Sequence, residues 1–530
     1  MEVETRGSKP RRIRALRPVG TRAVLAELDG LKDVLALQDM LTRAPLPGQV
    51  DVVAAAETVM VVGESASAIR AIRARLLELD ITTPEVTGSG LVVIDTVYDG
   101  EDLTDVAGIT GLSPDAVVAA HTGQVWTVAF AGFAPGFGYM VGQNDVLTVP
   151  RRPSPRTAVP AGSVALGGPY SAVYPRSSPG GWHLIGRTGA RMWDLERTQP
   201  ALVRPGDRVQ YRAVREVVNV AAVSTRPPES EQHLGSGLSG LRILKPGAQS
   251  LVEDLGRRGY GPLGVSAAGA LDRASLRRAN RLVGNAASAA AIESVNGGLV
   301  VEAVGDQMVA VTGAPSTLTV RSSSNRTVPM ATPFVLLDGE VLTVGPPECG
   351  FRSYLAVRGG VDVAEVLGSR SADTMSGVGP APLVPGQVLP AGGNTVSAAV
   401  GSPELQPDFP STGVTVLEVV PGPRDDWFDS SAIESLTSQE WVVTPQSNRV
   451  GMRLDGTPLQ RTRKGELPSE GTVAGALQIP PAGLPVLFLA DHPITGGYPV
   501  IGVVREEHLD LAAQVPIGGR IRFGLTTFTP

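Results

Sequence analysis

Two residues of this chain have side chains and neighbours suited to acid or base chemistry. His121 ends a predicted helix shortly before the glycine- and aromatic-rich loop 131–139, and an imidazole titrates near neutral pH. Asp491 and His492 stand immediately before the double glycine at 496–497. Adjacent strand residues point to opposite faces, so at most one of this pair faces a site, and we favour Asp491. The sequence therefore predicts His121 and Asp491 as catalytic candidates, with helix capping as the competing interpretation of His121.

A repeated pattern marks two places where the backbone can approach a ligand. Pro-Ala-Gly at 160–162 leads through an apolar stretch to the double glycine 180–181, and the same order recurs from 481–483 to 496–497. Glycine pairs let backbone amides bind carboxylate or phosphate, whereas the bends of a barrel rim need glycine for steric reasons. Both interpretations stay open. The candidate binding residues around the two pairs are Ser163, Gly180, Gly181, Arg187, Ser469, Glu470, Thr495, Gly496 and Gly497.

Four arginines lie in glycine- or proline-rich loops rather than on exposed helix faces. They are Arg156, Arg187, Arg358 and Arg370. A guanidinium group can bind a carboxylate or phosphate through two parallel hydrogen bonds, which makes all four candidate substrate-binding residues. The alternative is a set of surface salt bridges worth ~0 to 1 kcal/mol each. We expect two of the four arginines to bind substrate. The sequence does not indicate which two.

Aromatic side chains stand beside the same glycine-rich segments. Phe133 and Phe137 lie in the loop 131–139, while Trp182 and Tyr498 follow the two double glycines. These rings suit an apolar pocket, although aromatic residues make up only 4% of the chain and each is equally suited to a core. Because the two copies of the repeat carry different side chains, we expect unequal contributions to one composite site, with Trp182 and Tyr498 as candidate substrate-binding residues.

Several catalytic and cofactor-binding classes have no matching motif in this sequence. Cys349 is the single cysteine, which excludes an internal disulfide and a thiolate metal cluster within one chain. There is no G-x-S-x-G motif and no Walker loop, and no lysine stands in the Met-Lys-Met setting of a biotinylated carrier. The sequence therefore predicts no bound metal. The four lysines are at positions 9, 32, 245 and 464.

The composition favours many short strands over long solvated helices. Among 530 residues there are 63 glycines and 44 prolines, with 42% hydrophobic and 18% charged residues. The net charge of -6 and the lack of a basic stripe with interleaved aromatics argue against nucleic-acid or membrane partners. The longest apolar run, 484–490, has the length of a buried strand. We therefore predict a cytoplasmic, mainly β protein, with the basic segment 9–17 as a solvated tail.

Turn signals divide the chain into a small α+β domain and three β modules. Residues 11–90 read as alternating strands and helices, with helical periodicity at 31–43 and 65–79. Three glycine-rich turns, two of them Pro-Gly, each close one of the later modules. A stretch rich in Pro, Ser and Gly reads as a linker. The predicted boundaries are 11–90 for the α+β domain, 91–222 for the first β module, 223–240 for the linker, and 241–400 and 413–530 for the other two.

Specific motifs in both halves resemble a known family. Residues 13 to about 215 resemble the B subunit of the bacterial ATP-dependent 5-oxoprolinase, also called allophanate hydrolase subunit 1. Residues 241–530 resemble the C subunit of the same enzyme, or allophanate hydrolase subunit 2. The motifs that carry the first resemblance are 132–139 (GFAPGFGY), 150–152, 155–164 and 178–188. Those that carry the second are 253–257 (EDLGR), 279–285, 354–360, 367–371, 469–471 and 495–499.

The resemblance implies a fold, an activity and a partner. Each β module would be a cyclophilin-like barrel, and the chain would be the fused B and C components of a 5-oxoprolinase. In that family ATP, as co-substrate, activates the lactam of 5-oxoproline and water opens it to L-glutamate, together with a separate A subunit. The substrate would be a small carboxylate or amide; the ATP site stays unplaced. Two alternatives remain: the carboxyltransferase part of a biotin-dependent urea carboxylase or urea amidolyase system, and a non-catalytic regulator of a histidine kinase.

Three departures from the family pattern put the exact substrate in doubt. The family usually has Val-Gln-Asp where this chain has Glu253 between Val252 and Asp254. It has Gln-Thr where this chain has Pro and Ile at 493–494, and Gln-Thr-Gly where this chain has Pro, Tyr and Ser at 169–171. Amide side chains are therefore replaced close to both predicted binding segments.

Overall fold

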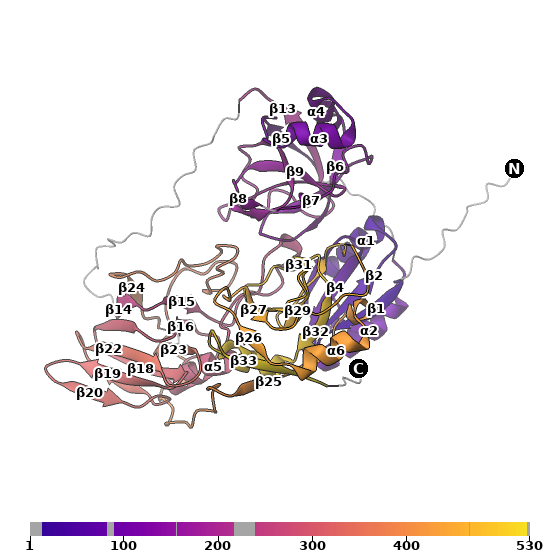
Figure 1. Cartoon of the computed structure of the whole chain (residues 1–530). Helices are drawn as coiled ribbons and strands as arrows, with labels where there is room; N and C mark the ends of the chain where they lie inside the picture. Colours follow the sequence, from indigo (N-terminus) through magenta and orange to yellow (C-terminus); the bar gives the residue numbers. More distant parts are fainter. Residues whose placement is uncertain are drawn as a thin grey trace.

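The computed structural model describes residues 13–81, 90–154, 156–216, 239–393, 395–465 and 467–526. These residues form four units, and the mainly β architecture predicted from composition is confirmed. Figure 1 shows the indigo N-terminal unit lying against the yellow C-terminal barrel, with residues 91–213 above them. Among the described residues, no helix has the length and apolarity needed to span a membrane.

The N-terminal α+β unit is a four-stranded antiparallel sheet in the order β1-β2-β4-β3 with two helices. β4 pairs with β2 on one side and with β3 on the other. It therefore lies between the two strands that α1 connects, which is a split β-α-β arrangement. Both faces of the sheet are buried, one against the helices and the other against the C-terminal barrel, which explains the continuous apolar runs. Its elements are β1 (Ala15–Val19), β2 (Ala23–Glu27), α1 (Leu31–Arg43), β3 (Gln49–Ala54), β4 (Thr58–Gly63) and α2 (Ala66–Glu78).

The first barrel, residues 91–213, is a seven-stranded sheet in the order β12-β9-β10-β7-β6-β13-β5. A β-bridge between Val97 and Arg187 joins its two edge strands, so the ring is nearly closed. Two short helices stand where the sequence predicted one. The elements are β5 (Leu91–Thr96), α3 (Leu103–Thr110), α4 (Pro114–Thr122), β6 (Val125–Ala131), β7 (Gly138–Val141), β8 (Arg156–Val159), β9 (Ser163–Gly167), β10 (Tyr170–Val173), β11 (Ser178–Gly180), β12 (His183–Arg187) and β13 (Arg208–Ala213).

The two-sheet unit, residues 240–390, consists of a six-stranded and a five-stranded sheet that share one apolar core. Helix α5 packs on β18 and β23. The elements are β14 (Gly240–Pro246), β15 (Gln249–Glu253), α5 (Arg273–Leu282), β16 (Ala291–Val295), β17 (Leu299–Val304), β18 (Gln307–Gly313), β19 (Ser316–Arg321), β20 (Asn325–Val328), β21 (Phe334–Leu336), β22 (Val341–Pro347), β23 (Arg352–Val357) and β24 (Val388–Pro390).

The C-terminal barrel, residues 414–525, is closed by seven strands in the order β25-β32-β29-β30-β27-β26-β33. Its parallel pair, β25 and β33, brings the last strand back to the first. The elements are β25 (Val414–Pro421), α6 (Ser430–Ser438), β26 (Trp441–Val443), β27 (Gly451–Asp455), β28 (Glu470–Gly471), β29 (Ala476–Gln478), β30 (Val486–Phe488), β31 (Thr495–Gly496), β32 (Val500–Val504), α7 (Leu509–Ala513) and β33 (Arg520–Leu525).

Candidate functional site

A cavity of about 420 Å³ lies between the first barrel and the C-terminal barrel. It contains residues from both copies of the repeated pattern, because Trp182 lines one wall and Tyr498 another. The composite arrangement expected from the sequence is thus present in the geometry. The lining residues are Phe133, Phe137, Tyr139, Arg151, Arg152, Pro153, Tyr174, Pro179, Gly180, Gly181, Trp182, Arg461, Gly465, Pro481 and Tyr498.

One wall of the cavity is a packed group of aromatic rings. The Phe137 ring meets the rings of Phe133, Tyr174 and Trp182 edge to face, with centroids 5.2, 5.2 and 5.6 Å apart. Phe137 is 2% and Trp182 5% exposed, so their orientations are fixed by packing. Tyr498, contributed by the C-terminal barrel, is 40% exposed. This arrangement offers flat apolar faces to a small ring.

The double glycines serve close packing. An added Cβ would lie 2.3 Å from the Tyr174 hydroxyl at Gly180 and 2.5 Å from the Gln478 amide nitrogen at Gly496. Among the described residues with positive φ, none belongs to either double glycine, so neither pair has the alternating backbone of an anion-binding nest. The structure therefore favours the steric interpretation of both pairs.

The charged groups of the cavity are arginines. Arg151, Arg152 and Arg461 line it, and no carboxylate stands among its lining residues in the described chain. Arg461 makes no hydrogen bond or ion pair with the described residues, while Arg152 donates to Asp102 through Nη1 at 2.5 Å. Guanidinium groups in this number provide an electrostatic environment suited to a carboxylate.

Asp102 anchors the arginine side of the cavity, and sequence reasoning missed it. Arg156 donates two hydrogen bonds of 2.9 Å to its carboxylate, and the Leu184 amide donates a third of 2.7 Å. Burial opposes ionisation of Asp102, but the hydrogen bonds from Arg156 and Leu184 outweigh it and lower its pKa. Arg156 thus positions the loop beside the cavity and does not line it. Its partner is 54 residues away, so no local signal could have found Asp102.

His121 lies inside the first barrel, away from the cavity. Its Nδ1 is 2.7 Å from the Tyr98 hydroxyl and its Nε2 is 2.9 Å from the Ser171 hydroxyl. The rings of Trp126 and Tyr211 pack against it. Complete burial lowers the pKa of His121 to about 3, so the imidazole is neutral at physiological pH. The structure does not bring this predicted catalytic residue to the site.

Asp491 is buried in a charge cluster, whereas His492 lines a different cavity. Arg449 donates two hydrogen bonds of 3.1 Å to Asp491, and the Thr374 hydroxyl donates a third of 2.7 Å. Burial raises the pKa of Asp491 above its usual value. The sequence analysis favoured Asp491 as the member of the pair that faces a site. In the structure, His492 lines a cavity, whereas Asp491 lines neither that cavity nor the one between the barrels.

Most of the other predicted binding residues have contacts within the protein. Arg187 pairs with Asp99 at 2.8 Å, Arg370 pairs with Asp362 and Glu365, and Arg358 donates to backbone carbonyls. These three loop arginines fit the salt-bridge or structural interpretation rather than the substrate-binding one. Ser163, Thr495, Gly496 and Gly497 do not line the cavity, and Ser469 and Glu470 lie in a separate polar cleft with Arg424.

Comparisons with known proteins assign both halves to domains of known type. The family "Carboxyltransferase domain, subdomain C and D" matches residues 14–203, and "Carboxyltransferase domain, subdomain A and B" matches residues 263–525. The chain is 37% identical over 289 residues to the C subunit of 5-oxoprolinase from Escherichia coli (strain K12), covering 53% of this chain and 90% of that relative.

A second relative and one solved structure extend this result. The chain is 45% identical over 133 residues to the B subunit of 5-oxoprolinase from Escherichia coli O157:H7, which covers 24% of this chain and 61% of that relative. The crystal structure of TTHA0988 superposes with a TM-score of 0.81 at 33% identity, covering 95% of this chain and 99% of the other. The chain therefore belongs to the carboxyltransferase-domain family and joins a B-like half to a C-like half in one polypeptide.

Proposed function

We propose that the chain is the fused B and C component of an ATP-dependent 5-oxoprolinase, working with a separate A subunit. The relatives support the proposal, since one half resembles the B subunit and the other the C subunit of that enzyme. The observation that carries it is the cavity between the two halves, where rings from one half face Tyr498 and Arg461 of the other. A site divided in this way requires both halves.

The cavity suits a small planar ring that bears a carboxylate. Arg461, together with Arg151 and Arg152, would bind the carboxylate of 5-oxoproline. The faces of Trp182 and Tyr498 would flank the lactam ring and exclude water from it. A cavity of about 420 Å³ is large enough for this substrate.

The chemistry needs ATP because an unstrained lactam is a poor electrophile. Transfer of the γ-phosphoryl group of ATP to the lactam oxygen releases ADP and makes the ring carbon electrophilic. One water adds to that carbon and the ring C–N bond breaks, the nitrogen taking up a proton, which gives an acyl phosphate. A second water then releases L-glutamate and inorganic phosphate. The chain's contribution in this proposal is to hold the carboxylate and orient the lactam, which are positioning effects. ATP enters as the co-substrate.

The test is reconstitution with the A subunit. The purified chain, the A subunit, ATP and 5-oxoproline should together release L-glutamate and ADP, and leaving out any one of them should abolish the release. The Tyr498→Ala variant should lose most of the activity while remaining folded by circular dichroism, because Tyr498 is 40% exposed. Full reconstitution without glutamate release, together with biotin-dependent carboxyl transfer to urea, would overturn the proposal.

A further inference from the structure

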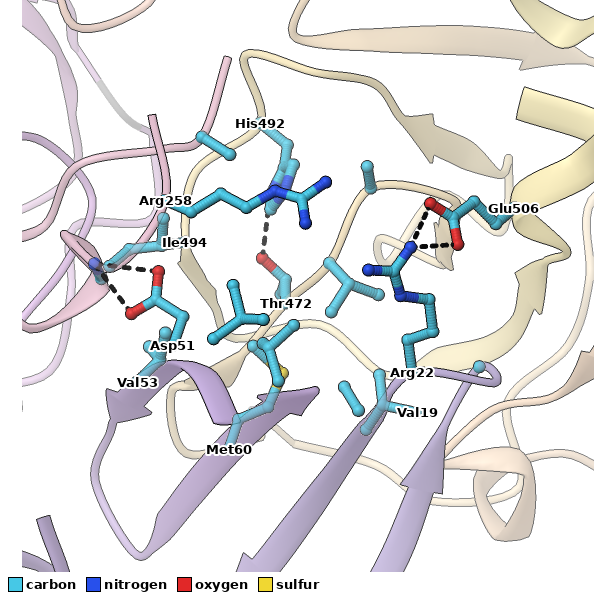
Figure 2. A pocket seen from close by; sticks show the side chains of 18 of the residues that line it. Val19, Arg22, Asp51, Val53, Met60, Arg258, Thr472, His492, Ile494 and Glu506 are labelled. Carbon is cyan, nitrogen blue, oxygen red and sulfur yellow. Dashed lines mark hydrogen bonds and ion pairs between the residues drawn. The ribbon is translucent and has the colours of Figure 1, made fainter. Parts of the chain in front are cut away.

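A second cavity, of about 200 Å³, lies where three units meet. Figure 2 shows its lining side chains coming from the N-terminal sheet, from the segment that carries Arg258 and from the C-terminal barrel. Its floor is apolar, since Val19, Val53, Met60 and Val503 are all buried. It contains none of the residues that line the cavity proposed for 5-oxoproline.

Cationic groups surround the mouth of this cavity. The Arg258 and Arg22 guanidinium groups both extend toward its middle (Figure 2). Arg22 forms a bidentate pair with Glu506, and this pair leaves little net charge. Arg258, by contrast, makes no hydrogen bond or ion pair within the described part of the chain. Arg258 is therefore an unpaired cation of this cavity, and Arg273, whose guanidinium has no hydrogen bond or ion pair with the described residues, is a second.

The loop that carries Arg258 is held in place by Asp51. The Asp51 carboxylate accepts hydrogen bonds of 3.2 Å from the amides of Gly259 and Gly261. This contact joins the N-terminal sheet to the two-sheet unit directly beside Arg258. The guanidinium is thus presented over the apolar floor by a fixed backbone, so that less ordering is required when an anion binds.

His492 supplies a further polar group from the C-terminal barrel. Its Nδ1 lies 2.9 Å from the carbonyl of Pro493 and 3.3 Å from the hydroxyl of Thr472. A proton on Nδ1, donated to that carbonyl, leaves Nε2 as an acceptor. The side chain is 8% exposed, and its ring stacks on Phe488 with 11° between the planes, which fixes its orientation.

We propose that this cavity binds a small monocarboxylate with an apolar chain, such as a short-chain fatty acid. The carboxylate would pair with Arg258 and the chain would lie on the floor formed by Val53, Met60 and Val503. The apolar floor excludes a strongly hydrated dianion, and the volume excludes a nucleotide. The inference does not depend on the proposed lactam chemistry, because the two cavities share no lining residue.

Titration calorimetry with sodium butyrate and sodium hexanoate on the full chain tests the proposal. Hexanoate should bind more tightly, by about fourfold for each added methylene group that is buried. Arg258→Gln should weaken hexanoate binding about tenfold, as should Met60→Trp, which fills the floor. Arg321→Gln, an exposed arginine on β19, is the matched control and should bind as the wild type does.

Each outcome decides whether the carboxylate binds in this cavity. Arg258 is exposed, so its substitution should leave the fold intact even where Met60→Trp does not. At the same concentration, hexanoate should raise the melting temperature of the wild type more than that of Arg258→Gln. Equal affinities of wild type and Arg258→Gln would overturn the proposal. Loss of binding in Arg461→Gln with retention in Arg258→Gln would also overturn it, by placing the ion in the first cavity.

Discussion

Arg424 of the C-terminal barrel donates a hydrogen bond of 2.6 Å to the carboxylate of Glu27 in the N-terminal sheet. The same guanidinium donates to Glu470 through Nε at 2.9 Å. All three side chains are largely buried at the base of a polar cleft, so one cation lies between two carboxylates. This contact joins the B-like half to the C-like half within one polypeptide.

Replacing Arg424 by leucine should destabilise the junction between the halves. Glu470 would remain buried without its counter-ion, whereas Glu27 would keep Arg17 at 2.5 Å. Removal of one partner from a buried pair costs about 3–5 kcal/mol. Urea denaturation at pH 7 measures this loss. Arg463→Leu removes a more exposed arginine paired with Asp426 and should cost under about 1 kcal/mol. Equal effects of the two substitutions would show that the contact is not a stabilising one.

Arg461→Gln should weaken 5-oxoproline binding without affecting stability. Arg461 lines the first cavity and makes no hydrogen bond or ion pair with the described residues, so its loss leaves no partner unpaired. Loss of one charge-assisted hydrogen bond of about 1.5 kcal/mol corresponds to roughly a tenfold increase in Kd. Titration calorimetry gives Kd and a thermal melt gives stability. The control is Arg453→Gln, exposed on β27, and a similar loss of affinity in that variant would contradict the assignment.

The shared cavity was the part of the site that sequence could predict. The repeated Pro-Ala-Gly to double-glycine pattern placed Trp182 and Tyr498 at equivalent points of two barrels, and both side chains line one cavity. The alternation of apolar residues and the turn signals likewise predicted the strands. The glycines themselves proved to be needed for packing against Tyr174 and Gln478, which depends on neighbours that no local pattern specifies.

The charged residues could not be assigned in the same way. Glu470 was predicted to bind substrate as a polar neighbour of the second double glycine, yet Arg424 binds it from 46 residues away. Arg156 is similarly bound by Asp102 across 54 residues. A buried charge needs a partner, and the identity of that partner depends on the tertiary fold. Local spacing therefore predicts which segments meet more reliably than it predicts which charges stay free.

His121 should make the protein sensitive to acid. Burial lowers its pKa to about 3, against about 6.5 in the unfolded chain. The folded state binds fewer protons, so this contribution to stability is complete above pH 6.5 and is lost as the pH falls toward 3. Melting temperatures measured from pH 7 to 4 should fall less steeply in His121→Asn than in the wild type. Tyr98→Phe removes a hydrogen-bond partner but keeps the imidazole, so a flattened profile in that variant would contradict this origin.

Arg449 is the centre of a fully buried charge cluster between the two-sheet unit and the C-terminal barrel. Its guanidinium lies 3.2 Å from Glu253, 2.5 Å from Glu293 and 3.1 Å from Asp491. All four side chains are at most 2% exposed. Three carboxyl groups share this cation, and burial raises the pKa of Glu253 well above its usual range. Burial thus favours the protonated form of Glu253, which is similar in shape to the glutamine expected at this position.

Glu253→Gln should consequently stabilise the protein at neutral pH. The raised pKa of Glu253 means that its contribution to stability is complete below about pH 4.3 and is lost as the pH rises toward the folded-state value. Glutamine does not titrate, so the variant should be more stable than the wild type at pH 7, and its advantage should shrink toward pH 4. Guanidinium denaturation at several pH values measures the difference. Arg449→Met should do the reverse and cost about 3–5 kcal/mol, because Glu253 and Asp491 lose the cation that they share, while Glu293 keeps Arg352 at 3.6 Å. A pH-independent difference between Glu253→Gln and the wild type would show that Glu253 is ionised in the folded state.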